Sequence, residues 1–174
     1  KFVYVLDRSG SMGDSHGEAL AAAKRELASS LDQLDSVQQF QIIFYNEVAR
    51  KFNPTGQAGR LAFGTSQNKI EAKKFIDSIE ADGGSAHEDA LVMAIRLQPD
   101  VIFFLTDADD PKLTSRDLAR IERLGAGTII NTVEFGSGPQ RESENFLVKL
   151  SRQSGGQHTY VDVTKLPQGA PKGK

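Results

Sequence analysis

Two short runs of uninterrupted apolar residues constrain the fold of this chain more than any other feature. The runs are Phe2–Leu6 and Val101–Leu105. Neither shows the inside–outside alternation of a half-exposed strand, and both are typical of parallel strands that are covered on both faces. A polar turn and then a helical pattern follow each run. The sequence therefore predicts a central parallel sheet with helices packed on both of its faces.

The rest of the chain continues this alternation of strands and helices. Further strands are expected at residues 40–45, 48–52, 127–135 and 158–163, the second of them as an antiparallel edge strand. The spacing of apolar residues predicts five helices, which lie at Leu20–Leu34, Ile70–Ile79, 86–97, Leu118–Leu124 and 146–150. The predicted fold is α/β: a doubly wound, mostly parallel sheet of about six strands, with one antiparallel edge strand and helices on both faces.

Local patterns predict where some helices begin. Ser15 and Glu18 have the spacing of a capping box, and so do Thr114 and Asp117. Each pair is expected at the start of the helix that follows it. Residues 53–68 contain one proline and three glycines, so we expect them to form a surface excursion.

Composition excludes several classes of protein. The chain has 174 residues, a length typical of one domain, and its net charge of −2 gives no reason to expect nucleic acid as a partner. It has no cysteine, which excludes disulfides, zinc–thiolate sites and cysteine nucleophiles. No apolar run approaches the roughly 20 residues of a membrane span, so we expect no direct membrane insertion by this fragment. Residues 1–163 are expected to form the domain, and residues 164–174, rich in proline, glycine and lysine, a flexible tail.

Hard oxygen donors gather in the turn after the first strand. Asp7, Ser9 and Ser11 stand at alternate positions, and in an extended chain such side chains point to the same side. Gly10 and Gly13 allow the backbone to bend. One carboxylate and two hydroxyls on the same side suit Mg²⁺, Mn²⁺ or Ca²⁺ rather than a metal that prefers thiolates.

Two further loops are expected at the same edge of the sheet. Thr106–Asp110 follows the second apolar strand, and Gly83–Ser85 precedes the third helix. Right-handed crossovers bring the carboxyl ends of parallel strands to one edge, which is where such sheets bind ligands. We therefore expect the Asp107 carboxylate and the Ser85 hydroxyl near the first turn.

In combination these motifs resemble the metal-ion-dependent adhesion site of a von Willebrand factor type A domain. The matching segments are Asp7-x-Ser9-x-Ser11, Gly83-Gly84-Ser85 and Thr106-Asp107. Leu6 to Met12 is similar to the Leu-Asp-x-Ser-Gly-Ser-Met start of bacterial members. The resemblance covers nearly the whole chain. It implies a doubly wound sheet with one antiparallel edge strand, and binding more often than catalysis.

The resemblance also assigns roles to five residues. It implies that Mg²⁺, or Mn²⁺ or Ca²⁺, is held by Asp7, Ser9, Ser11, Ser85 and Asp107. The first two serines would bind the ion directly, the third stands where the family usually has threonine, and the aspartates would hold the ion directly or through water. Hydroxyls and waters leave the charge of the ion under-neutralised. An acidic side chain of a protein partner can then complete the octahedron.

Two features depart from the family's pattern. Ala108 stands where the family usually has glycine, and Asp109 and Asp110 follow it. These extra carboxylates would either raise the affinity for the metal or repel an acidic ligand. No amphipathic helix is expected after the last strand, so the terminal-helix switch of integrin-like members is not supported.

Simpler roles compete for some of these residues. Ser85 and Glu88 also have capping-box spacing, so this serine could serve only to cap a helix. Asp109 and Asp110 are more typical of a solvated turn than of metal ligands. Arg8 alternates with the oxygen donors, so we expect it to have a structural role or to lie at the rim.

The three histidines show no spacing typical of metal ligands. His16 and His87 are expected in loops on the binding edge, and His158 is expected away from it. Surface or packing roles are the better expectation for all three.

Catalysis is the weaker alternative. A Mg²⁺-dependent phosphotransferase or phosphatase would use Asp7 as its nucleophile, but it needs a second carboxylate two residues on, where this chain has Ser9. Gly10 and Gly13 do not complete the glycine pattern of a dinucleotide-binding turn. The patterns of a nucleophile elbow and of a phosphate-binding P-loop are absent. We therefore expect a metal-dependent protein-binding module and not an enzyme.

These residues do not determine the compartment. A core strand at the very start of the chain suggests that it is excised from something longer. Bacterial-type relatives suggest a secreted or membrane-anchored protein as one option. The partner, the preferred metal and the oligomeric state stay open at this point.

Overall fold

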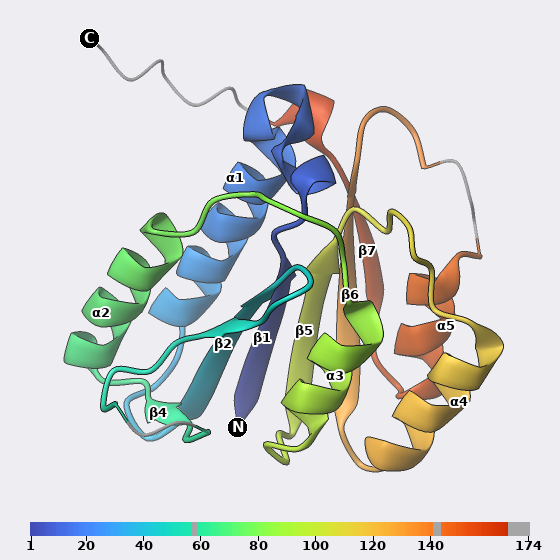
Figure 1. The fold of residues 1–174 in the computed structure, drawn as a ribbon. Helices are drawn as coiled ribbons and strands as arrows, with labels where there is room; N and C mark the ends of the chain where they lie inside the picture. Colours follow the sequence, from blue (N-terminus) through green and yellow to red (C-terminus); the bar gives the residue numbers. More distant parts are fainter. Residues whose placement is uncertain (57–58, 141–143, 167–174) are drawn as a thin grey trace, which may run out of the picture.

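A seven-stranded sheet forms the centre of the molecule (Figure 1). The computed structural model describes residues 1–56, 59–140 and 144–166. The strands are β1 (Phe2–Asp7), β2 (Gln39–Tyr45), β3 (Arg50–Lys51), β4 (Ala62–Phe63), β5 (Val101–Thr106), β6 (Ile129–Gly136) and β7 (His158–Asp162). Their order is β3-β2-β1-β5-β6-β7, and β4 pairs with β2 beyond this path.

The predicted fold class is confirmed. The strands β1, β2, β5, β6 and β7 pair in parallel, while β3 and β4 are both antiparallel to β2. The expected edge strand at 48–52 is the two-residue strand β3. The strand β4 lies inside the stretch 53–68 that was expected to be a surface excursion, and it is too short for its pattern to show in the sequence.

Helices cover both faces of the sheet, as Figure 1 shows. They are α1 (Gly10–Asp32), α2 (Ser66–Asp77), α3 (His87–Ile95), α4 (Ser115–Leu124) and α5 (Phe146–Gln153). The helices α1 and α2 lie on one face, and α3, α4 and α5 lie on the other. No helix in the described ranges has both the length and the apolar character that a membrane crossing requires.

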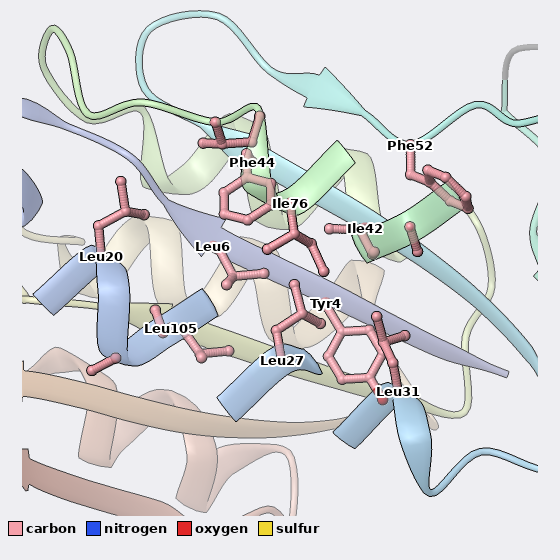
Figure 2. Packing of buried hydrophobic residues seen from close by; sticks show 14 of the residues in the cluster. Tyr4, Leu6, Leu20, Leu27, Leu31, Ile42, Phe44, Phe52, Ile76 and Leu105 are labelled. Carbon is pink, nitrogen blue, oxygen red and sulfur yellow. The ribbon is translucent and has the colours of Figure 1, made fainter. Parts of the chain in front are cut away.

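Alternate residues of β1 face the two layers. Tyr4 and Leu6 belong to the core beneath α1 and α2, whereas Val3 and Val5 belong to the core beneath α3, α4 and α5. Figure 2 shows the first core, with side chains of α1 packed over Tyr4 and Leu6. Because successive residues of a strand point to opposite faces, a strand buried on both faces must be apolar throughout. The run Phe2–Leu6 meets this requirement.

The start of α1 differs from the prediction. The helix begins at Gly10, directly after Ser9, and not at the capping-box pair Ser15 and Glu18. The Gly10 N–H donates to the carbonyl of Gly83 at 2.8 Å, so a distant loop supplies the partner of a free N–H group at the helix end. Local spacing predicted the wrong start because this partner is remote in the sequence.

The other expected caps have opposite outcomes. At α4, Thr114 and Asp117 form the predicted capping box. At α3 the cap position is Ala86, with no capping hydrogen bond from a side chain, so Ser85 does not cap this helix. The hydroxyl of Ser85 is therefore used elsewhere.

The end of the chain is described only in part. A single 3-10 turn, η1 (Val163–Lys165), follows β7, and Leu166 packs against the core beneath α1 and α2. Residues 167–174 lie outside the described residues. The division into a domain at 1–163 and a flexible tail at 164–174 therefore stays a prediction.

Candidate metal centre

The site lies at the carboxyl ends of β1 and β5, where the chain changes from building the sheet on one side of β1 to building it on the other side. From β1 the chain crosses through α1 to β2 on one side, while β5 lies on the other side of β1. Ligands bind doubly wound sheets at such a switch point, beside the carboxyl ends of the strands. Asp7 is the last residue of β1 and Thr106 is the last residue of β5. The Thr106 hydroxyl donates to Asp7 Oδ2 at 2.8 Å, so the two strand ends are in contact.

The Asp7 carboxylate accepts hydrogen bonds from several segments of the site. Its side chain is fully buried. The backbone N–H of Ser9 donates to Asp7 Oδ1 at 2.8 Å, and the hydroxyl of Ser85 donates to Asp7 Oδ2 at 3.3 Å. With the bond from Thr106, donors from three segments converge on one carboxylate. A buried carboxylate needs such partners because it has lost its contact with water.

The hydroxyls of Ser9 and Ser11 lie side by side. Their oxygens are 3.1 Å apart. Ser9 is buried, and Ser11 is partly exposed in the first turn of α1. The expected extended chain from Asp7 to Ser11 is therefore wrong, and it is the start of the helix that places the two hydroxyls together. Neighbouring ligands of an octahedral Mg²⁺ ion, bound at the usual Mg–O distance, are about 3 Å apart. The spacing of these two oxygens therefore fits a small divalent cation.

Asp107 joins this group from the loop after β5. Its carboxylate is partly buried, and this burial raises its pKa, with a smaller contribution from the nearby charge of Asp7. A hydrogen bond from the hydroxyl of Ser11 acts in the opposite direction. Asp107 is thus within reach of both the Ser9–Ser11 pair and Asp7, as the sequence predicted for these residues.

The five predicted site residues therefore come together at one edge of the sheet. They supply two carboxylates and three hydroxyls. The described part of the chain contains no group of three His, Cys, Asp or Glu side chains placed to hold a metal. The two carboxylates and three hydroxyls are all hard oxygen donors, a chemistry that fits Mg²⁺, Mn²⁺ or Ca²⁺.

The loop after β5 has an unusual backbone. Ala108 adopts a φ of 59°, in the left-handed region that favours glycine. Its N–H donates to the Thr106 hydroxyl at 3.1 Å, and the N–H of Asp109 donates to Asp107 Oδ1 at 3.3 Å. Asp109 and Asp110 are exposed, in line with the expected solvated turn. The backbone thus keeps the glycine conformation although the glycine is replaced.

The loop before α3 is held by residues that sequence reasoning missed. The N–H of Gly84 donates to Glu47 Oε1 at 3.1 Å, and Asn46 donates to the carbonyl of Asp82 at 2.8 Å. Gly83 has a φ of 72°, and a Cβ there would lie 2.7 Å from Glu47 Oε2. The positive φ favours glycine at this position, and a larger residue would also displace the end of the Glu47 side chain that holds Gly84.

Arg8 has the structural role that the sequence predicted. Its guanidinium donates to Asn46 Oδ1 at 3.1 Å and to the carbonyl of Glu80 at 3.4 Å. Its backbone carbonyl accepts from the N–H of Asp82 at 2.8 Å. Arg8 thus links the turn after β1 to the segment between α2 and α3.

His87 is placed differently from the prediction. It is the first residue of α3 rather than part of a loop, and its ring is buried. Its Nδ1 lies 2.8 Å from the hydroxyl of Tyr45, the last residue of β2. Burial and the negative charge of Asp7 raise the pKa of Tyr45 well above 10. The position of Tyr45 at a third strand end was the signal that could have identified it.

The outcomes for the other two histidines differ. The side chain of His16 lies outside the described residues. His158 lies at the start of β7, where Nδ1 is 2.9 Å from the Thr132 hydroxyl and Nε2 is 3.3 Å from Glu134 Oε2. Burial lowers the pKa of His158, and the charge of Glu134 opposes this shift. The expected packing role therefore fits its surroundings.

A pocket adjoins the site on the side of β6 and β7. Its volume is about 340 Å³. Asp107, Ala108, Glu134, Asn145 and Tyr160 are among the residues that line it. The edge of the sheet therefore offers a concave surface next to the group of oxygen donors.

Comparison with known proteins identifies the family of this chain. The family model described as the von Willebrand factor type A domain matches residues 2–109, more than half of the chain. Inter-alpha-trypsin inhibitor heavy chain H4 from Bos taurus is 32% identical over 95 residues, which cover 55% of this chain and 10% of that protein. The chain thus spans about a tenth of the length of this relative.

Solved structures share the fold. A von Willebrand factor type A protein from Catenulispora acidiphila has a TM-score of 0.77 at 24% identity and covers 94% of this chain and 39% of its own. Proximal thread matrix protein 1 from the mussel byssus, described with a zinc-occupied site of this kind, has a TM-score of 0.67 at 20% identity, covering 95% and 42%. Manganese-loaded TRAP protein from Plasmodium vivax has a TM-score of 0.61 at 14% identity, covering 94% and 69%.

At these identities the structural likenesses establish the shared fold and nothing finer. The match to the family model covers β1 through the loop after β5, and so contains all the donors described above. The chain belongs to the von Willebrand factor type A domain family.

Proposed function

We propose that this domain is a divalent-metal-dependent protein-binding module of the adhesion or scaffold type. Mg²⁺, or Mn²⁺ or Ca²⁺, would bind at Asp7, Ser9, Ser11, Ser85 and Asp107, and an acidic side chain of a protein partner would complete its coordination. The observation that carries the proposal is the 3.1 Å spacing of the Ser9 and Ser11 hydroxyl oxygens beside the two carboxylates.

The hydrogen bonds of the site suit a cation. The hydroxyl proton of Ser85 is directed at Asp7, and that of Ser11 at Asp107. A hydroxyl that gives its proton to a carboxylate keeps its lone pairs free to face a positive ion. The serines therefore supply neutral ligand oxygens, while the aspartates supply the charge and fix the orientation of the serines.

The charge balance of the site favours an acidic partner. Three of the five residues are neutral hydroxyl donors, and an aspartate that holds the ion only through water leaves part of the ion's charge uncompensated. A hard cation with remaining water ligands can exchange one of them for a carboxylate oxygen. The adjoining pocket of about 340 Å³ supplies surface for a residue next to that carboxylate. Two solved structures of the same fold, one with a zinc-occupied site and one loaded with manganese, support a divalent ion here.

The metal proposal is tested by calorimetric titration of chelator-stripped protein with MgCl₂ and MnCl₂. We expect binding heat for the wild-type chain and a loss of affinity of about tenfold or more in Ser11→Ala and Asp107→Asn. Ser30→Ala is the matched control, because its hydroxyl bonds to Tyr4 in the opposite part of the core. Asp110→Asn is the control for charge in the same loop. Absence of Mg²⁺ and Mn²⁺ heat, or full affinity in Ser11→Ala, would count decisively against the site.

The phosphotransferase alternative finds no support in the geometry of Asp7. A nucleophilic carboxylate must reach a phosphorus atom, but Asp7 is fully buried and both of its oxygens accept hydrogen bonds. An assay with p-nitrophenyl phosphate and Mg²⁺ tests this alternative. Turnover that disappears in Asp7→Asn would restore it, and absence of turnover in the wild-type protein removes it.

A further inference from the structure

His87 connects three segments that build the candidate metal centre. It is the first residue of α3 and lies two positions after Ser85. Its ring is 2% exposed and packs among Tyr45, Phe104 and Phe146, with ring centroids 5.6–5.9 Å away. An imidazole in such apolar surroundings needs partners for both of its nitrogens, because an unpaired buried polar atom is costly.

Both ring nitrogens have a polar partner. Nε2 lies 3.2 Å from the backbone carbonyl oxygen of Asp109. A carbonyl only accepts, so Nε2 carries the hydrogen and donates it. Nδ1 lies 2.8 Å from the Tyr45 hydroxyl. His87 thus links the end of β2 to the loop that follows β5.

That loop needs an external support. Ala108 is held at a φ of 59°, a conformation that costs an L-residue about 1–2 kcal/mol. In the described chain, the N–H groups of Ala108, Asp109 and Asp110 bond to side chains of the same short segment or of the strand end before it. The Asp109 carbonyl, by contrast, bonds to a side chain of α3. This bond therefore anchors the loop to a rigid element.

The anchored loop carries a proposed metal ligand. Asp109 lies two residues after Asp107, on the far side of the strained Ala108. His87 Nδ1 is also 3.9 Å from Asp7 Oδ2, which is close but beyond hydrogen-bonding distance. The imidazole therefore lies beside Asp7 and bonds to the loop that carries Asp107, without supplying a ligand to the site.

We infer that His87 is a positioning residue of the metal centre: through the Asp109 carbonyl it holds the loop of Asp107 in the conformation that binds the ion. This inference rests on the proposed function. It explains why the site keeps its geometry although alanine replaces the glycine usual after the second aspartate. The rigid anchor compensates for the strain that this replacement introduces.

The first test does not require the metal. Hydrogen exchange at the Ala108 amide is measured by NMR in the metal-free wild-type protein and in His87→Phe and His87→Gln. Phenylalanine retains a ring among the aromatic neighbours but has no donor, whereas glutamine offers an N–H near the position of Nε2. We expect exchange about tenfold faster in His87→Phe and near the wild-type rate in His87→Gln. Equal rates in His87→Phe and wild type would overturn the inference.

The second test measures Mg²⁺ affinity by calorimetry in the same variants. We expect about tenfold weaker binding in His87→Phe, the usual effect of losing a group that orients a metal ligand, and at most threefold in His87→Gln. His87→Met, which fills the space among the aromatic rings without an N–H donor, replaces His87→Phe if that variant does not fold, and the same loss of affinity is expected. Tyr4→Phe, which loses a hydroxyl bonded to Ser30 at 2.8 Å, is the matched control.

The outcomes separate the two hypotheses. If the wild-type protein binds no divalent ion, the proposed function fails, while the exchange experiment still decides whether His87 holds the loop. If the wild-type protein binds Mg²⁺ and His87→Phe binds it equally well, only the inference about His87 fails. A purely structural role would lower the melting temperature of His87→Phe without changing its Mg²⁺ affinity, and this result also overturns the inference.

Discussion

At the scale of single residues, the most informative position is Ala108. Its left-handed backbone lies between Asp107 and Asp109, in the loop that contributes the second carboxylate of the site. Strain of this kind persists where surrounding contacts determine the conformation, and it is concentrated at functional sites. Here the contacts are the Thr106 hydroxyl on one side and the His87 ring on the other.

Relief of this strain gives a prediction for stability. Ala108→Gly should raise the free energy of unfolding by about 0.5–1 kcal/mol, because glycine adopts a positive φ without steric cost while its extra freedom in the unfolded chain offsets part of the gain. Urea unfolding of both proteins measures this difference. Ala126→Gly is the control. Ala126 also lies outside helices and strands but is not among the residues with positive φ, so this substitution should lower the free energy of unfolding.

At the scale of elements, the capping box of α4 is the local device that sequence spacing predicted and the structure confirms. The Asp117 carboxylate accepts from the N–H of Thr114 at 2.8 Å and from its hydroxyl at 2.7 Å. These hydrogen bonds lower the pKa of Asp117 from its usual 3.8. The carboxylate form is therefore the one that the folded helix start favours.

The lowered pKa of Asp117 sets a pH dependence. A folded-state pKa below the unfolded value adds stability above the unfolded pKa, and this stability is lost as the pH falls through the folded pKa. Wild type should therefore be more stable than Asp117→Asn at pH 7, and the difference should narrow below pH 3.8. Denaturant unfolding of both proteins at pH 7 and below pH 3.8 measures the difference in the free energy of unfolding. Asp110→Asn, a change of an exposed carboxylate outside the helix, should show no comparable narrowing.

The loop between α2 and α3 is held by hydrogen bonds to distant parts of the chain. The Gly83 carbonyl accepts from the first residue of α1, and the Gly84 N–H donates to Glu47 after β2. Ser85 is thereby held with its hydroxyl toward Asp7 instead of at the cap of α3. The role of a serine in such a pattern is decided by these remote contacts and not by its local spacing.

At the scale of the whole molecule, metal binding and folding should be coupled. An ion that binds only the folded state stabilises it by mass action, by about 2.7 kcal/mol at 100 times the dissociation constant. We therefore expect excess MgCl₂ to raise the melting temperature of the wild-type protein and a chelator to reverse the rise. Ser11→Ala should melt near the metal-free wild-type temperature with or without MgCl₂. An equal rise in Ser11→Ala would place the stabilising ion elsewhere.

The layers and the edge that carries the site could be predicted from the sequence because they depend on patterns within single segments. A strand covered on both faces must be apolar at every position, so Phe2–Leu6 and Val101–Leu105 identify the centre of the sheet. Parallel strands with right-handed crossovers place their carboxyl ends together. Asp7, Ser9, Ser11 and Asp107 follow those strands, and the contacts among their side chains agree with this expectation.

Tertiary structure alone decided the start of α1, the strand β4 and the contacts of His87, because these features depend on groups far apart in the chain. The start of α1 at Gly10 is determined by the carbonyl of Gly83, and β4 exists because Ala62 and Phe63 pair with β2. His87 meets Tyr45 from 42 positions away and Asp109 from 22. Periodicity reports which face of a segment is buried, but it carries no information about which remote donor or acceptor a polar group meets, and such pairings fix the geometry of this site.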